Sequence, residues 1–316
     1  MMQLQYYLII LSSVIGLAAA LVLTKVYQNL TNTALRVSVL YNIMAGLCTA
    51  LVFFCFNGFR LSITPFSIGM ALIMTLCSGT YVILGFKLIS MGHISTYTLF
   101  LMLGGMMLPY FFGLGFLNEE FSLPRLFGLI LMIVSIILTG MHDENSQAHL
   151  QHADENPPSK KRHKKYLLIC LTVFLLNGVV NIIAKVHQLP EFSDLAVTAK
   201  EFVMLTALTK AVVFSLLYYY LCFRDYKKPI DQKPPRAKFT LLVFAVITAG
   251  ALVDGLSCLG QLTSASHLPA TVLFPLVTGG SIILTALAGR IFFREKPSKK
   301  ALVGIILCFV ATLFFL

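Results

Sequence analysis

The sequence predicts an all-α integral membrane protein of about ten transmembrane helices, arranged as two inverted repeats of five helices each. Three observations lead to this fold class. Of the 316 residues, 58% are hydrophobic and 12% are charged, and a mean hydropathy of +0.85 is too apolar for a soluble fold. Apolar runs long enough to cross a bilayer recur along the chain. One long segment also occurs twice in related form.

Each predicted span is a run of on the order of 20 mostly apolar residues, the length that crosses a bilayer as a helix. Strands are not expected, because no run alternates polar and apolar residues as a membrane strand does. The predicted spans, in chain order, are Tyr6–Thr24, Val37–Phe56, Phe66–Phe86, Tyr97–Leu117, Phe121–Gly140, Tyr166–Ala184, Phe202–Phe223, Phe239–Leu262, Leu268–Phe293 and Lys300–Leu316. Five of them fall in each half of the chain.

The duplicated segment is Tyr97–Leu138, which recurs as Leu273–Phe314. Each copy consists of an apolar span, a turn that contains an acidic residue and a serine, and a second apolar span. The aligned pairs, all at one offset, are Glu119 and Glu295, Gly104 and Gly280, Ser122 and Ser298, and Gly128 and Gly304. The chain is therefore predicted to consist of two related halves.

A shorter motif occurs earlier in each half, at a different offset: Lys25 to Gln28 reads KVYQ, and Lys185 to Gln188 reads KVHQ. Because each half holds five spans, an odd number, the second half is expected to enter the membrane with the opposite orientation. Inverted halves of this kind can open a molecule alternately to the two sides of a membrane. The predicted organisation is a first repeat in residues 1–141, a polar flexible linker in residues 142–165 and a second repeat in residues 166–316.

The formal net charge of +11 comes mostly from basic residues in the short connections between spans. The connections after the first, third, fifth, seventh and ninth spans hold most of them, and the positive-inside rule places such connections in the cytoplasm. Both termini are then expected outside, in a multi-pass protein of the plasma membrane, which in a bacterium is the inner membrane. Nucleic-acid binding is not expected, because membrane insertion already explains the basic residues.

Motifs for enzyme chemistry are absent from the sequence, which has no glycine-rich phosphate loop, no Cys/His metal spacing and no nucleophile motif. No enzyme activity, cofactor or metal is therefore expected. The seven cysteines lie in or at the ends of apolar runs and are predicted to be packing residues. Glu119 and Glu295 lie at predicted helix ends, where we expect them to form turns and caps.

Two five-span repeats that each close with an acidic residue, a serine and a glycine-bearing last helix resemble the EamA-type members of the drug/metabolite transporter superfamily. The residues of the resemblance are Glu119, Glu120, Ser122 and Gly128, then Glu295, Ser298 and Gly304, with the turns Leu88–His93 and Thr263–His267. The resemblance implies a ten-helix bundle whose central cavity is lined mainly by helices one, three, four, six, eight and nine.

The same resemblance implies transport of small metabolites. The family moves amino acids, nucleotide sugars, phosphorylated metabolites and drugs, many of them outward in bacteria. Two features depart from the family pattern. Pro109 and Pro275 do not align with each other, and the charge rule places the termini outside, whereas several relatives have them inside.

Ionisable residues deep in predicted spans are candidate functional residues, because a charge in lipid is costly. Lys210 lies near the middle of the seventh span and Asp254 in the outer part of the eighth, at depths that differ by roughly 5 Å. An ion pair between them would either fix two neighbouring helices or act in coupling or gating. An unpaired Asp254 would instead be a candidate proton carrier, because an apolar site favours the neutral acid.

Asn177, Asn181 and Lys185 recur at every fourth position and share one face of the sixth helix. Such a stripe contacts either a substrate or neighbouring helices. Substrate contact is favoured, because the resemblance places this helix on the cavity. Lys185 and its counterpart Lys25 suit an anionic group of a substrate, or they extend to lipid headgroups from helix ends.

Tyr81 and Gln261 complete the candidate substrate-binding residues, with packing as their alternative role. The sequence favours a secondary transporter of a small polar metabolite such as an amino acid or anionic metabolite, with export expected by analogy. A proton-coupled drug exporter is the nearest alternative, and a membrane receptor or scaffold without transport is the alternative of another class. The expected partners are the substrate, the lipid bilayer and, for the drug exporter, a coupling proton. The oligomeric state is open, and a monomer is compatible with the sequence.

Overall fold

The computed structural model describes residues 2–31, 35–90, 94–148, 160–226, 240–292 and 299–316. Within these residues the chain is helical and contains no strand. The helices are α1 (Met2–Leu30), α2 (Leu35–Phe56), α3 (Pro65–Ser90), α4 (Ile94–Phe116), α5 (Leu123–Ala148), α6 (Lys160–His187), η1 (Pro190–Phe192, a 3₁₀ turn), α7 (Ala199–Tyr226), α8 (Leu241–Ala265), α9 (Ala270–Phe292) and α10 (Lys299–Leu313). Each α-helix covers most of one predicted span.

Eight of the described helices contain a stretch long and apolar enough to cross a membrane. The apolar part of α5, Leu123–Thr139, is shorter, and α10 has 15 residues. Large apolar side chains such as Leu8, Leu72 and Leu216 are exposed on the helices. Helices that are apolar on both inner and outer faces are suited to lipid. The expected all-helical, multi-pass membrane protein is therefore confirmed at this level.

Two helices extend beyond their apolar parts into the predicted linker. α5 continues to Ala148, and α6 begins at Lys160. A helix satisfies its own backbone, so it can leave the membrane through polar residues of good helix propensity. Residues 149–159 of the predicted linker lie outside the described residues, as do Glu295 and Ser298 of the second repeat.

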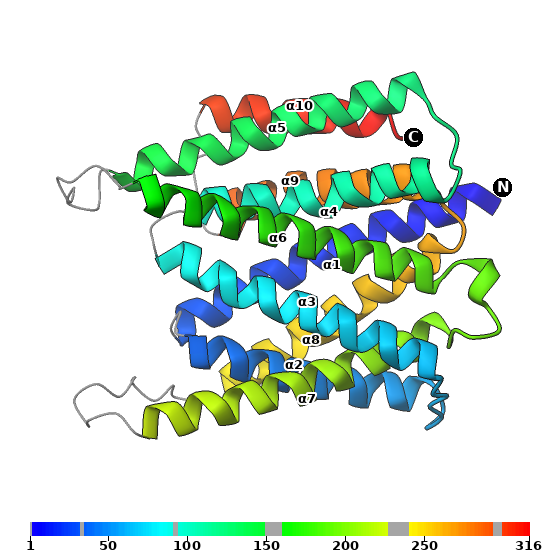
Figure 1. Ribbon diagram of the computed structural model, residues 1–316, viewed down its shortest axis with the longest axis vertical. Helices are drawn as coiled ribbons and strands as arrows, with labels where there is room; N and C mark the ends of the chain where they lie inside the picture. The colour runs from blue at the N-terminus through cyan, green and yellow to red at the C-terminus, as the bar shows by residue number, and fades with distance from the viewer. Residues whose placement is uncertain (1, 32–34, 91–93, 149–159, 227–239, 293–298) are drawn as a thin grey trace.

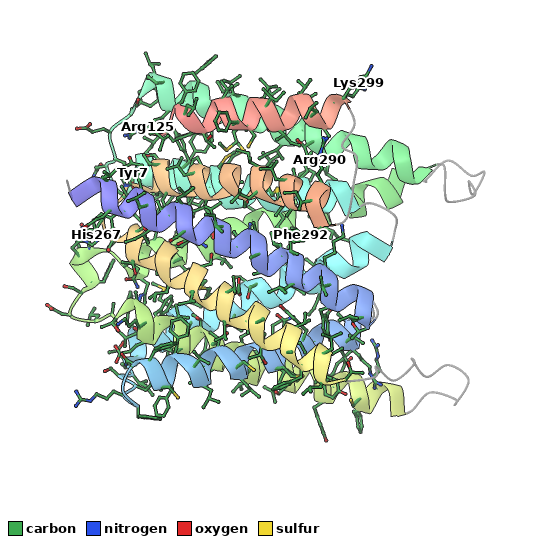
Figure 2. The ribbon with its side chains drawn as sticks, turned by 180° about the vertical axis from the view of Figure 1, so that it is seen from behind. Tyr7, Arg125, His267, Arg290, Phe292 and Lys299 are labelled. Carbon is green, nitrogen blue, oxygen red and sulfur yellow. The ribbon has the colours of Figure 1, made fainter. Side chains whose placement is uncertain are left out.

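Successive α-helices run in alternating directions, which brings both chain termini to one end of the bundle (Figure 1). We call this the terminal end; α2, α4, α6 and α8 finish there. At the other, distal end, α1, α3, α5, α7 and α9 finish. Arg290 and Lys299 lie toward the distal end, whereas Tyr7, Arg125 and His267 lie toward the terminal end (Figure 2).

Helices from the two halves of the chain pack on each other along the whole bundle. α1 packs along α8 and against α9, and α6 packs along α3 and against α4. α2 pairs with α7, α4 with α9 and α5 with α10. These last three pairs occupy successive levels along the longest axis in Figure 1. Gly104 permits a close crossing of α4 and α6, because a Cβ there would meet the backbone carbonyl of Phe174.

The apolar packing around α2, α3, α7 and α8 differs between the two ends. At the terminal end one cluster joins all four helices and includes Phe53 and Phe202. Toward the distal end the packing divides into three clusters. One joins α1, α2 and α8 at Tyr27, one joins α2 and α7 at Phe214, and one joins α3, α4 and α6 at Cys170. Among the residues whose side chains are described, the four helices therefore pack together at the terminal end and fall into separate groups toward the distal end.

Candidate functional site

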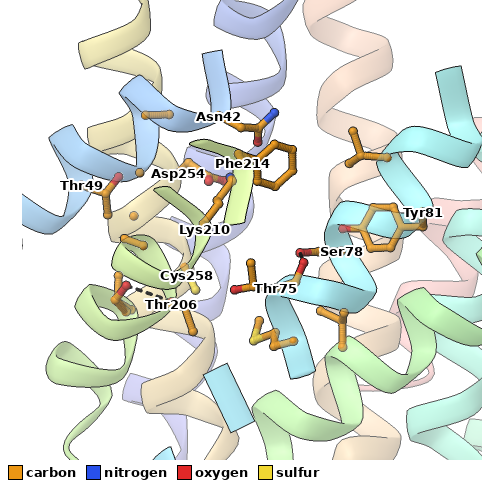
Figure 3. Close-up of a pocket in the computed structure, with 18 residues that line it drawn as sticks. Asn42, Thr49, Thr75, Ser78, Tyr81, Thr206, Lys210, Phe214, Asp254 and Cys258 are labelled. Carbon is orange, nitrogen blue, oxygen red and sulfur yellow. Dashed lines mark hydrogen bonds between the residues drawn. The ribbon is translucent and has the colours of Figure 1, made fainter. Parts of the chain in front are cut away.

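A cavity of about 260 Å³ lies among α2, α3, α7 and α8, with Val180 of α6 on its wall (Figure 3). Its polar lining residues are Asn42, Thr49, Thr75, Ser78, Tyr81, Thr206, Lys210, Asp254 and Cys258. Pockets for drug-sized ligands measure about 300 to 1,000 Å³. The cavity therefore suits a ligand of the size of a small metabolite.

Lys210 and Asp254 lie at the same depth in the bundle. Lys210 is 11 residues after Ala199, where α7 begins, and Asp254 is 11 residues before Ala265, where α8 ends. At a rise of about 1.5 Å per residue, both lie roughly 17 Å from the terminal end. The depth difference of roughly 5 Å expected from the sequence is therefore not found.

The two charged side chains face the same part of the cavity from α7 and α8 (Figure 3). Lys210 is half-buried and Asp254 is more exposed. Their head groups do not come within the 4.0 Å that defines an ion pair. Because the surrounding helices are apolar, a ligand with groups of opposite sign would find strong partners here.

Hydroxyl groups of α3 form one wall of the cavity. Thr75, Ser78 and Tyr81 follow each other at intervals of three residues and share one helix face. The Thr75 Oγ1 atom lies 2.9 Å from Thr209 Oγ1 of α7, and the Ser78 hydroxyl donates to the Thr75 carbonyl at 3.0 Å. Hydroxyls that donate to the backbone keep acceptor lone pairs for a ligand.

Three of the predicted site residues line the cavity: Tyr81, Lys210 and Asp254. Gln261 and Lys25 do not. The Gln261 amide donates to a serine of α8 that in turn donates to an α1 carbonyl, so it belongs to the α1–α8 contact. Lys25 lies near the distal end of α1 and is half-buried.

The predicted polar stripe of α6 does not line the cavity either. Asn177 Nδ2 donates to the carbonyl of Leu101, and Asn181 Nδ2 donates to the carbonyl of Gly105, both at 2.7 Å. Both acceptors belong to α4. Lys185 lies one turn further and donates to carbonyls where α8 ends. In this structure the stripe makes interhelical hydrogen bonds, which was the alternative to substrate contact.

The lining helices differ from those that the family resemblance implied. α3, α6 and α8 contribute as expected, but α2 and α7 line the cavity and α1, α4 and α9 do not. The expectation is wrong for those three helices. They pack with α5 and α10 in one apolar cluster that includes Met106 and Phe274, so their inner faces are occupied.

Apart from Lys210, sequence reasoning missed the residues that α2 and α7 contribute, notably Asn42, Thr49 and Thr206. A threonine in an apolar helix commonly bonds its own backbone, as Thr206 does at 2.9 Å, so it gave no signal. Asn42 was the available signal in the second span, and the three-residue spacing of the α3 hydroxyls was another.

Polar contacts close the terminal end beyond the cavity. His187 is 1% exposed, stacks on Phe202 with ring centroids 3.6 Å apart, and shares a 2.9 Å hydrogen bond between Nε2 and Ser67 Oγ. Glu201, at the start of α7, accepts from the Ser62 N–H at 3.0 Å. These contacts join α6 to α3 and tie α7 to the link between α2 and α3.

No family model matches the chain, and no curated protein matches it. Among solved structures, a chain described as "Crystal structure of protein" superposes with a TM-score of 0.69 at 13% sequence identity. The alignment covers 96% of this chain and 95% of that chain. Identity at this level shows a shared fold alone, which here extends over nearly the whole of both chains.

Proposed function

We propose that the protein is a secondary transporter of a small polar metabolite, related to the EamA-type drug/metabolite transporters, in a plasma membrane. The proposal depends on the cavity that holds Lys210 and Asp254 roughly 17 Å deep among apolar helices. Charged residues at such depth are costly unless water, protein or a substrate compensates them. A cavity that packing closes at one end suits a carrier in one of its states.

The proposed mechanism is alternating access between two inverted five-helix repeats. Most of the helix contacts support it, because they recur when five is added to each helix number, with ten subtracted from any sum above ten. The α1–α8 contact then corresponds to α6–α3, α4–α6 to α9–α1, α3–α7 to α8–α2, and α4–α5 to α9–α10. The pairs α2–α7, α4–α9 and α5–α10 correspond to themselves. α1 and α6, the first helices of the two halves, run in opposite directions in Figure 1.

The proposed state is closed at the terminal end and open toward the distal end. Val203 and Cys258, on the cavity wall, also belong to the single cluster that packs the terminal end. Ala45, Phe214 and Tyr81, also on the wall, belong to three separate distal clusters. By the positive-inside rule the distal end faces the cytoplasm, so the cavity opens inward and the termini lie outside. Export as the direction of transport rests on the family resemblance.

Among polar metabolites, an amino acid fits the cavity best. Its carboxylate can approach Lys210 while its ammonium group approaches Asp254, and the α3 hydroxyls can bind either group. A purely anionic metabolite would leave Asp254 facing like charge. This arrangement favours a zwitterion over a sugar phosphate or an amine.

The test is solute exchange by purified protein in liposomes, with amino acids, amines, sugar phosphates and nucleosides as candidates. Lys210→Met should weaken amino-acid binding about 10- to 100-fold, because a hydrogen bond to a charged group contributes about 1.5 to 3 kcal/mol. It should affect the matching decarboxylated amine much less. Asp254→Asn should show the reverse selectivity, sparing the N-acetylated amino acid. Tyr81→Phe, on the α3 wall of the same cavity, is the matched control with a smaller loss.

Two outcomes would favour the alternatives. If Asp254→Asn removes the pH dependence of transport and leaves amine or drug efflux in place of amino-acid exchange, a proton-coupled drug exporter is the better description. If no solute of a broad panel exchanges, although a thermal-stability screen shows the protein folded, the transporter proposal fails and a receptor or scaffold role replaces it.

A further inference from the structure

The link between α8 and α9 is held by two side chains of opposite charge. Lys185 of α6 donates through Nζ to the carbonyls of Ala265 and Leu268, at 2.7 and 2.6 Å. Further along the same segment, the Glu119 carboxylate accepts from the backbone N–H of Ala270 at 2.6 Å and of Thr271 at 2.9 Å. Four backbone groups within seven residues are therefore bound by one lysine and one glutamate.

These contacts satisfy the backbone groups that a helix leaves without partners at its ends. The carbonyl of Ala265, the last residue of α8, lacks an intrahelical donor, and the first N–H groups of α9 lack intrahelical acceptors. The carbonyl of Leu268 belongs to the link itself. A cation near a helix C-terminus and an anion near a helix N-terminus also match the two helix dipoles. Glu119 is thus a helix cap, as the sequence predicted, but it caps a helix of the other half of the chain.

The local structure places both groups with little freedom. Lys185 is 5% exposed, so its ammonium has no access to bulk solvent as an alternative partner. Asn118 adopts φ 51°, a left-handed conformation that turns the chain after α4 and directs Glu119 back. The Glu119 N–H donates to the Gly113 carbonyl, and a Cβ at Gly113 would lie 2.6 Å from the Glu119 carboxylate. A side chain at position 113 would therefore displace the carboxylate.

Both residues belong to motifs that the two halves of the chain repeat, Lys185 in KVHQ and Glu119 in the acid-serine turn. The motifs have different offsets along the chain, but at the terminal end they meet on one link. We propose that Lys185 and Glu119 form a latch on residues 265–271 that holds the terminal end closed, and that the latch must release before the cavity opens there. This inference rests on the proposed transport function. Lys185 and Glu119 are positioning residues in it and do not contact the substrate.

The latch is tested by side-specific labelling of the cavity in liposomes. A full-length protein that lacks its seven cysteines and contains Ser78→Cys presents one thiol on the cavity wall. A membrane-impermeant thiol reagent is added either at the face with the termini or at the distal face. Lys185→Met and Glu119→Gln should raise the labelling rate from the terminal face by about 5- to 150-fold, the range of a typical coupling between two states. Labelling from the distal face should fall.

Asn181→Ala is the matched control, because it also removes one buried hydrogen bond of α6 but does not touch the link. It should lower the melting temperature and leave the ratio of the two labelling rates unchanged. Lys185→Arg and Glu119→Asp should restore the ratio at least in part. If Lys185→Met or Glu119→Gln still exchanges solute but leaves the ratio of the two labelling rates unchanged, the latch proposal is wrong and the transport proposal stands. A ratio that changes in protein that exchanges no solute supports the latch and rejects the transport proposal.

Discussion

The two ends of the bundle contain the same short motif, but its side chain at the third position joins different sets of helices at each end. At the terminal end, KVHQ places His187 against Ser67 of α3 and Phe202 of α7, so one side chain joins three helices. At the distal end, the matching residue of KVYQ is Tyr27. Its hydroxyl donates to the Val37 carbonyl at 2.9 Å, so its hydrogen bond joins α1 to the next helix in the chain, while its ring lies in an apolar cluster with α2 and α8.

This difference shows how similar halves can form an asymmetric molecule. A contact between sequence neighbours, such as the one at Tyr27, can persist whichever way the halves are arranged. A contact that crosses between the halves, such as His187 to Ser67, is expected in one arrangement and lost in the other. In the proposed transport mechanism, the closed end is therefore the end where the repeated motif forms hydrogen bonds across the halves.

The largest effect is expected from truncation of a buried phenylalanine at each end, and it tests whether the two ends differ. Phe202 is fully buried in the terminal cluster, and Phe214 is 2% exposed in a distal cluster. Truncation of a buried phenylalanine to alanine costs about 3 to 5 kcal/mol, so both Phe202→Ala and Phe214→Ala should lower the melting temperature. Only Phe202→Ala should also raise labelling of a cavity thiol from the terminal face. Equal labelling in both variants would contradict the difference between the ends.

A smaller effect is expected from the polar contacts of the repeated motif. Ser67→Ala leaves His187 Nε2 and the Val197 N–H without their serine partner, and a buried unsatisfied group costs about 1 to 3 kcal/mol. Tyr27→Phe is the matched change at the distal end, because it removes one hydroxyl and leaves the Val37 carbonyl without that bond. Both variants should melt at lower temperature, measured on purified protein in detergent. The rate of solute exchange should change in Ser67→Ala. An unchanged rate would show that the His187 hydrogen bond does not contribute to closure of the terminal end.

The smallest effect is expected at the α4–α6 contact. Asn177→Ala removes one interhelical hydrogen bond, and such bonds average about 0.6 kcal/mol in membrane proteins. Substrate affinity should stay within about twofold of the parent protein, because Asn177 does not line the cavity. The affinity is measured by titrating substrate and following the melting temperature of the protein. A loss of substrate affinity of tenfold or more would contradict this prediction and indicate that the α6 stripe binds substrate.

The membrane fold was predictable because the length and the apolar character of a run are enough to identify a membrane-crossing helix. Lys210 and Asp254 were predictable for a related reason, since charged residues stand out in such runs. The face that a helix presents to each neighbour was not predictable. Asn177 and Asn181 gave a clear polar stripe, but the stripe alone could not distinguish a cavity from the carbonyls of α4.

Apart from Lys210, the part of the cavity formed by α2 and α7 was also beyond the sequence, because the few polar residues in the middle of these helices do not mark one inner face. Glu119 shows the same limit for a single residue. Its position at a helix end predicted a cap, but the helix it caps begins at Ala270, 151 residues further along the chain. Only the packing of the two halves brings them together.

The equal depth of Lys210 and Asp254 has an electrical consequence. An amino acid held between them would lie parallel to the plane of the bilayer, with its positive and negative groups at the same fraction of the transmembrane voltage. Its binding would then move no net charge along the field, in contrast to a permanent ion, whose transfer changes free energy by about 2.3 kcal/mol per 100 mV. Exchange of such a substrate in the absence of a coupling ion is electroneutral because a zwitterion has no net charge. The equal depth adds that the binding step itself does not depend on voltage, so the same exchange rate is expected in polarised and depolarised vesicles.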